Sequence, residues 1–163
     1  MNTKGFIRII IVFSIIIVNI GCDQVSKKII RHHVYPYEMI HFLDDHLTVT
    51  RVENSGAFLS TGDSLPIPVK HIFLSFIPLI VIFLGLVYVF VKPGISNNML
   101  IGLCFVIGGG LGNLFDRITY GSVTDFLHVK MGFFQTGVFN FADVSIMIGM
   151  SIILIQFLFR KTI

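Results

Sequence analysis

The stretch MLIGLCFVIGGGLGNLF, from Met99 to Phe115, contains no charged residue, and Asp116 and Arg117 follow it directly. About 20 apolar residues cross a bilayer as a helix, so this stretch is a candidate membrane span. Its run of glycines resembles a nucleotide-binding loop, but neither a preceding strand nor a Walker lysine accompanies it. We therefore predict that these small residues let neighbouring helices, or a substrate backbone or acyl chain, approach closely.

The composition of the whole chain agrees with a membrane protein. The 163 residues are 54% hydrophobic and 13% charged, and their mean hydropathy is +0.86. Soluble domains contain about 25% charged residues, so a water-soluble enzyme is close to excluded. The apolar content excludes a disordered chain, and two cysteines are too few for a disulfide scaffold. A net charge of +3 is too small to indicate nucleic-acid binding, and we expect none.

Apolar stretches of similar length recur along the chain. We predict four transmembrane helices, at about residues 7–22, 71–91, 99–115 and 142–159. Polar segments separate these spans, and no linker divides residues 1–163 into two domains. The predicted fold class is therefore an all-α membrane protein, a single bundle of four transmembrane helices.

The segment between the first two spans has a different pattern. His46–Val52 alternates in side-chain type and is rich in β-branched residues, as a short strand is, and Asn54–Gly56 is typical of a turn. We predict a small extracytoplasmic β-cradle or half-barrel over about residues 35–65, lying on the membrane surface. Aromatic side chains could seat it at headgroup level. The candidates are Tyr35, Tyr37, Phe42 and Phe58.

The distribution of charge orients the bundle. Four spans put both termini on one side of the membrane, and the short segments on that side contain Lys4, Arg8, Lys92, Arg160 and Lys161. All nine carboxylates lie between Asp23 and Asp143, on or facing the other side. Because cytoplasmic segments carry the excess of Lys and Arg, both termini are predicted to be cytoplasmic and the active site to be at the outer face.

The N-terminal segment also resembles a lipoprotein signal peptide. Lys4 and Arg8 precede an apolar run that ends in Gly21-Cys22. Asn19, however, stands where such signals usually have leucine, and the later spans need the first helix for their topology. We therefore expect the first helix to be retained; in the alternative, an intact mass would show loss of the residues before Cys22 and a lipid adduct.

Ionisable side chains near the hydrocarbon core are candidates for function, because they are expensive to bury there. Four carboxylates lie at or near the predicted outer ends of spans: Asp23, Asp116, Asp125 and Asp143. Asp125 and Asp143 flank one outer loop. Two close carboxylates that share a proton can activate water and protonate a leaving group, so this pair predicts aspartyl-protease chemistry without a metal.

The same residues have structural interpretations that the sequence leaves open. Asn140 and Asp143 have the spacing of a capping box at the start of a helix, and Asp125 could form a local turn. Asp23 and Lys27, four residues apart on a helix, could form a surface ion pair.

Arg117 is similarly ambiguous. Its charge suits the negative end of a helix dipole. Its planar guanidinium could also hold a substrate carbonyl or a lipid phosphate.

Other chemistries have less support in the sequence. Neither HExxH nor GxSxG occurs. The outward-facing histidines match no standard zinc spacing; they are His32, His33, His41 and His46. We expect no metal site and no cofactor. Cys22 and Cys104 are predicted to lie at different depths, so we expect no disulfide.

Five blocks of sequence carry a family resemblance. They are Asp23-Gln-Val-Ser-Lys27, Asn54-Ser-Gly56-Ala57-Phe58, Gly108 to Arg117, Val123-Thr-Asp125-Phe126 and Phe139-Asn140-Phe-Ala142-Asp143. Each block alone is weak, but together their order and spacing resemble the bacterial lipoprotein signal peptidases, also called signal peptidase II. The resemblance covers essentially the whole chain, including four spans and an outer β-cradle.

This resemblance implies a membrane-embedded aspartyl endopeptidase of the bacterial cytoplasmic membrane. It would remove the signal peptide from prolipoproteins immediately before the diacylglyceryl-modified cysteine. By motif, Asp125 and Asp143 are the implied catalytic dyad. The residues implied to bind substrate or support the dyad are Asn54, Gly56, Asn113, Arg117, Asn140, Asp23 and Lys27. The implied partners are diacylglyceryl-modified prolipoproteins, membrane lipids and the cyclic peptide antibiotic globomycin, and we expect a monomer.

The chain departs from the family pattern at two places. Val144 follows Asp143 where the family commonly has serine, and Ser145 comes one step later. The turn block continues as Ala57-Phe58-Leu59-Ser60, where many relatives carry Trp or Gly. The first departure removes a hydroxyl beside the dyad but not the dyad itself, and the second alters the cradle surface.

For the mechanism we expect one aspartate to be ionised and to take a proton from the attacking water, with the other protonated. Asp143 is favoured as the ionised one, because a helix N-terminus stabilises an anion. Two other functions predict other features. An ion-coupled transporter predicts carboxylates spread through the bilayer and duplicated halves, neither of which the sequence shows. A non-enzymatic membrane scaffold leaves the cluster of Asn, Asp and Arg without a reason.

Overall fold

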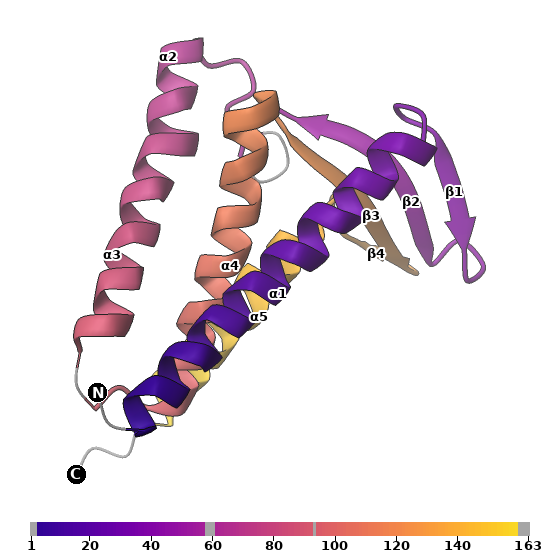
Figure 1. Ribbon diagram of the computed structural model, residues 1–163. Coiled ribbons are helices and arrows are strands. Elements are labelled where there is room, and N and C mark those ends of the chain that lie inside the picture. The colour runs from indigo at the N-terminus through magenta and orange to yellow at the C-terminus, as the bar shows by residue number, and fades with distance from the viewer. Residues whose placement is uncertain (1–2, 58–60, 93, 160–163) are drawn as a thin grey trace.

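The computed structural model describes residues 3–57, 61–92 and 94–159. Helices form a bundle, and a four-stranded antiparallel sheet is attached at one end of it (Figure 1). The described helical segments long and apolar enough to cross a membrane are Gly5–His33, Ile67–Val91, Asn97–Tyr120 and Phe141–Leu158. The prediction of a four-span bundle with a small sheet is confirmed. Phe58 and Leu59 of the predicted turn, and the cations Arg160 and Lys161, lie outside the described residues.

Helix α1, Thr3–His33, extends far beyond the predicted end of the span at residue 22 and includes the helical extension on which Asp23 and Lys27 were predicted to lie. Its continuation carries Asp23 and Lys27 on one face, and both side chains are fully buried. The helix therefore continues because tertiary contacts enclose its polar face, although the apolar run has ended. Basic residues in the last turn, Arg31 to His33, suit the negative end of the helix dipole.

The second span consists of three helical segments. Helix α2, Ile67–Lys70, leads into a π-helical turn, His71–Phe76, and then into α3, Ile77–Val91. Pro78 lies at the start of α3 and has no N–H to donate to the preceding turn, which accounts for the irregular helix there. The span begins earlier than the predicted start at residue 71.

Helix α4, Asn97–Tyr120, packs closely against α5, Phe141–Leu158. A Cβ atom added to Gly109 would lie 2.4 Å from the carbonyl oxygen of Ala142, and one on Gly149 would lie 2.5 Å from the carbonyl oxygen of Gly102. Only glycine permits such contacts between helix backbones, so the prediction of close packing by small residues is confirmed. The apolar core joins α4 to α1 and α3 through Val12, Ile16, Ile82, Val89, Leu100, Cys104, Ile107 and Leu114.

The sheet combines two distant parts of the chain. Its order is β1 (Met39–Phe42), β2 (Leu47–Asn54), β3 (Val123–Met131) and β4 (Phe134–Gln135). The predicted cradle over residues 35–65 contains β1 and β2 but omits β3 and β4. The antiparallel pairing of β2 with β3 brings the fourth block of sequence beside the start of the second, with Asn54 opposite Val123 and Val52 opposite Asp125.

The two ends of the bundle differ in content. The sheet lies at the end where α1 and α4 finish, whereas α1 begins and α5 finishes at the opposite end (Figure 1). At that opposite end, Arg8 Nη2 donates to the carbonyl oxygen of Val89 at 2.6 Å and so ties α1 to α3. Tyr35 and Tyr37, predicted to seat the cradle, are exposed beside the sheet.

The glycine contacts predict a difference between two helix-interior positions. Gly149→Ala should destabilise the protein by about 1–3 kcal/mol, because its methyl group would force α4 and α5 apart. Gly21→Ala is the matched control, because a Cβ at Gly21 meets no atom within 4 Å; its effect should stay below about 1 kcal/mol. Thermal unfolding in detergent measures both, and equal melting temperatures for the two variants would contradict the packing argument.

Candidate active site

The start of α5 organises the sheet end of the bundle. The Oδ1 of Asn140 accepts from the backbone N–H of Asp143 at 3.0 Å, and Asp143 Oδ2 accepts from the backbone N–H of Asn140 at 3.1 Å. This is the predicted capping box. A second carboxylate takes part, because Ala142 N–H donates to Asp23 Oδ1 at 2.9 Å. The first turn of α5 is thus fixed both to its own cap and to α1.

Asp125 lies within strand β3, not in a local turn, and is only 4% exposed. Its two oxygens accept from amide groups of distant residues. Asn54 Nδ2 donates to Oδ2 at 3.0 Å, and Asn140 Nδ2 donates to Oδ1 at 2.6 Å. Strand β3, the last residue of β2 and the cap of α5 therefore all position this carboxyl group.

Burial raises the pKa of Asp125 to about 6. The amide of Asn54 opposes this rise in pKa, the negative charge of Asp143 adds to it, and the amide of Asn140 opposes it again. Desolvation outweighs the amide donors because the carboxyl group is almost fully enclosed. Asp125 is therefore suited to carry a proton at mildly acidic pH.

Asn140 connects the two aspartates. Its side-chain amide donates to Asp125, and its backbone N–H donates to Asp143. The two carboxyl groups, separated in sequence by most of an outer loop, thus lie on either side of one asparagine. The structure brings together the residues that the sequence singled out as a pair.

Asn113 of α4 connects this pair to buried charge. Its Nδ2 donates to Asp143 Oδ1 at 2.8 Å, while its Oδ1 accepts from Lys27 Nζ at 2.9 Å and from Asn140 Nδ2 at 3.2 Å. An ammonium group can only donate, so Lys27 must face the amide oxygen of Asn113. The amide nitrogen is then left to face Asp143.

Lys27 is the centre of a buried ion cluster. Its Nζ lies 2.8 Å from Asp23 Oδ2 and 2.9 Å from Asp116 Oδ2, and all three side chains are 0% exposed. Arg31 Nη2 adds an ion pair with Asp116 Oδ1 at 2.9 Å. The interpretation of Asp23 and Lys27 as a surface ion pair is therefore wrong. Two acidic and two basic groups balance each other inside the protein.

The turn after β2 reaches the site from the other side. Gly56 N–H donates to Asn54 Oδ1 at 3.0 Å, and Arg117 Nη2 donates to the carbonyl oxygen of Gly56 at 3.2 Å. The buried Nε of Arg117 has no hydrogen-bond partner among the described residues. Arg117 also borders a cavity of about 300 Å³ that Lys70 and Leu74 of the second span help to line. This arginine combines a fixed position with an unused donor.

Comparison with known proteins identifies this arrangement. Residues 15–159 match the family described as signal peptidase (SPase) II. The chain belongs to the signal peptidase II family. It is therefore a peptidase, and its four apolar helices make it a multi-pass bacterial membrane protein, as the sequence predicted.

Curated relatives named lipoprotein signal peptidase cover nearly the whole chain. The protein of Aquifex aeolicus (strain VF5) is 28% identical over 161 residues, which is 99% of this chain and 91% of the relative. The protein of Borrelia hermsii (strain HS1 / DAH) is 32% identical over 157 residues, 93% of this chain and 90% of the relative. A solved bacterial membrane enzyme superposes with a TM-score of 0.82 at 26% identity, covering 93% of this chain and 89% of that structure.

Sequence reasoning missed three polar residues of this signal peptidase II site. Gln24 Nε2 donates to Asp23 Oδ2 at 3.0 Å and to Asp116 Oδ1 at 3.2 Å. Arg31 Nε donates to Thr124 Oγ1 at 2.7 Å. The signal was present: Gln24 and Arg31 are three and four residues from Lys27 and share its helical face. The prediction placed Asp23 and Lys27 on the extension of the first helix but did not consider Gln24 and Arg31 on the same face.

The serine that follows Val144 has a structural role. The next residue, Ser145, is buried and its Oγ donates to Asn19 Oδ1 at 2.6 Å. This hydroxyl therefore ties α5 to α1 and does not substitute for a serine beside the dyad. The other departure, at Phe58 and Leu59, lies outside the described residues.

The buried ion cluster predicts contrasting effects at two adjacent lysines. Lys27→Met should destabilise this signal peptidase by about 3–5 kcal/mol, because Asp23 and Asp116 would keep buried charge with one partner too few. Lys28→Met is the matched control, since Lys28 is exposed and should change stability by less than about 0.5 kcal/mol. Thermal unfolding in detergent without added lipid compares them. Similar losses in both variants would show that Lys27 is not held as described.

Proposed function

We propose that Asp125 and Asp143 are the catalytic dyad with which this signal peptidase II cleaves prolipoproteins. One observation carries the proposal: Asn140 donates to both carboxyl groups, at 2.6 Å to Asp125 and at 3.1 Å to Asp143. Two carboxyl groups held this way can share one proton and one water molecule, which is the requirement of aspartyl-protease chemistry.

The surroundings assign different roles to the two aspartates. Asp143 lies in the first turn of α5, at the positive end of the helix dipole, and accepts from two N–H donors. Asp125 has its pKa raised to about 6 by burial and holds a proton more readily. Asp143 is thus the general base and Asp125 the general acid.

The reaction then runs in two steps. Asp143 takes a proton from water as the water oxygen bonds to the scissile carbonyl carbon, while the Asp125 proton polarises the carbonyl oxygen. When the tetrahedral intermediate collapses, the C–N bond breaks and the dyad returns a proton to the departing amine. Arg117 supplies a further donor, because its buried Nε is unpaired among the described residues and can bind a substrate carbonyl.

The substrate's lipid anchor explains where the cut falls. A diacylglyceryl group holds the modified cysteine at the membrane surface. Asp125 lies in β3 and Asp143 in the first turn of α5, and Figure 1 shows the sheet attached at one end of the bundle. The peptide bond immediately before that cysteine is therefore presented at the depth of Asp125 and Asp143. Membrane lipids surround the same helix ends. Globomycin, a cyclic peptide, would compete for this position.

The orientation and the oligomeric state follow from charge and from the site's composition. Arg8 and Lys92 lie at the bundle end remote from the sheet, and an excess of basic residues there supports a cytoplasmic location for that end. The active site would then face outward. Among the described residues, hydrogen bonds within one chain hold both carboxyl groups, which agrees with a monomer.

Two substitutions test the dyad. Asp125→Asn and Asp143→Asn should each lower turnover of a lipidated prolipoprotein peptide by about 10³-fold or more, because each removes a group that must gain or lose a proton. Asp45→Asn is the control: this exposed carboxylate pairs with His41 on the sheet and should leave turnover unchanged. Near-normal cleavage by either dyad variant, folded and inserted, would end the proposal. Globomycin should block the wild-type reaction.

The raised pKa of Asp125 predicts a pH profile. Below its pKa of about 6 the general acid is protonated, and above that pH it loses the proton, so kcat/KM should fall as pH rises through about 6. The two carboxyl groups titrate as a coupled pair, so the midpoint belongs to the dyad. Initial rates from pH 4.5 to 8.5 with a lipidated peptide measure the profile. A kcat/KM that is constant, or that rises, above pH 6 would reverse the acid–base assignment.

A further inference from the structure

A second cavity, of about 570 Å³, lies between the outward halves of α1 and α4. We propose that it binds the phosphate headgroup of an anionic phospholipid in the membrane leaflet at the sheet end of the bundle. The side chains that line this headgroup groove are Gln24, Lys28, Arg31, His32, Phe115 and Tyr120. That this leaflet is the outer one depends on the proposed orientation of the chain. Binding of the phosphate headgroup does not depend on that orientation.

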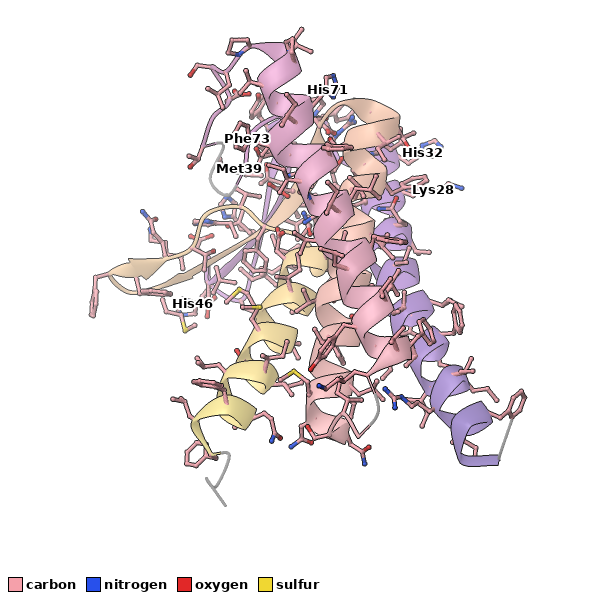
Figure 2. All side chains as sticks on the ribbon, turned by 90° about the vertical axis from the view of Figure 1, so that its left-hand side faces the viewer. Lys28, His32, Met39, His46, His71 and Phe73 are labelled. Atoms are coloured by element: carbon pink, nitrogen blue, oxygen red, sulfur yellow. The ribbon has the colours of Figure 1, made fainter. Side chains whose placement is uncertain are left out.

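The groove keeps an excess of positive charge. Lys28 and His32 are four residues apart on α1, and Figure 2 shows both side chains projecting away from the bundle. Among the described residues neither side chain forms an ion pair or a hydrogen bond. The nearest acids cannot neutralise them, because Asp23 and Asp116 are fully buried and already paired with Lys27 and Arg31.

One wall of the groove is held rigid in advance. The Arg31 guanidinium carbon lies 4.0 Å from the centre of the Tyr120 ring, while its Nε donates to Thr124 and its Nη2 forms an ion pair with Asp116. These contacts hold the Arg31 guanidinium in place before any ligand binds. A preorganised site loses less conformational entropy on binding. Lys28 and His32, by contrast, remain free to close on a phosphate.

The position along the membrane fits a lipid headgroup. The apolar run of α1 ends at Cys22, and Lys28 lies roughly 9 Å farther along the axis at 1.5 Å per residue. Basic side chains at this level attract anionic headgroups. Phe115 and Tyr120 are about half exposed, at 50% and 54%. Their rings offer an apolar surface to the acyl chains and an aromatic anchor at the interface.

Lipid retention tests the headgroup groove. The protein is reconstituted in vesicles of equal parts phosphatidylcholine and phosphatidylglycerol, extracted in detergent, and its bound lipid is measured by native mass spectrometry. Wild type should retain phosphatidylglycerol in preference to phosphatidylcholine. The double variant Lys28→Gln/His32→Gln should lower this preference by about fivefold through the loss of the Lys28 charge, and by more through the loss of the His32 ring hydrogen-bond donor.

A matched double variant separates the groove from general surface charge. Lys130→Gln/His46→Gln removes the same side-chain types from the exposed sheet and should retain phosphatidylglycerol as wild type does. Equal loss in both double variants, or no loss at the groove, would overturn the proposal. Displacement of the lipid by inorganic phosphate alone would also overturn it, because the site would then recognise a free anion.

The lipid proposal and the dyad proposal can each be contradicted without affecting the other. Asp125→Asn should retain phosphatidylglycerol like wild type, since Asp125 does not line the groove. Lys28→Gln/His32→Gln should keep wild-type turnover of a peptide substrate in detergent. Loss of lipid preference in Asp125→Asn would overturn the groove as an independent site, even with the dyad established.

Discussion

The start of α5 imposes the constraint on which the rest of this protein depends. The first N–H groups of a helix have no partner within the helix, and at the edge of a membrane core they cannot be left unpaired. Three side chains satisfy them or complete the cap: Asn140, Asp143 and Asp23. In a soluble protein such a cap would serve only stability. Here its Asn140 donates to both Asp125 and Asp143 and so brings these two carboxylates into one low-dielectric site. Structural need and catalytic potential therefore coincide in the same hydrogen bonds.

The buried carboxylates of Asp23 and Asp116 require compensating positive charge. Lys27 neutralises Asp23 and Asp116, and through the oxygen of Asn113 it orients an amide N–H toward Asp143. Lys27, which makes burial of these acids tolerable, thus also determines which atom of the Asn113 amide faces Asp143 of the proposed dyad. Such networks are high-stakes, since a fully satisfied one is rigid and an incomplete one is destabilising. This explains why so many polar residues of the signal peptidase lie within the bundle.

Close approach of the backbones makes this arrangement possible. Gly109 and Gly112 bring α4 against Ala142 and Asp23, where a Cβ atom would lie only 2.4 Å from Ala142 O and 2.6 Å from Asp23 Oδ2. The β2–β3 pairing then closes the site from outside and carries Asp125 to Asn54 and Asn140. On the exposed side of the same helix, Lys28 and His32 have no ion-pair partner among the described residues. Along α1, Lys27 and Arg31 pair with buried acids, whereas Lys28 lies on the exposed face of the helix.

The sequence by itself determined the four spans, the cap of α5 and the strand after His46, because apolar runs, capping spacing and alternation are local properties of the chain. Motif order also identified Asp125 and Asp143 as a pair before any geometry was known. Only the tertiary structure decided that α1 continues to His33 and that Asp23 and Lys27 are buried, because this burial depends on Asp116 and Asn113 of a distant helix. It likewise decided the pairing of β2 with β3 and the places of Gln24 and Arg31. These features depend on partners far along the chain, and local patterns carry no information about which distant groups will meet.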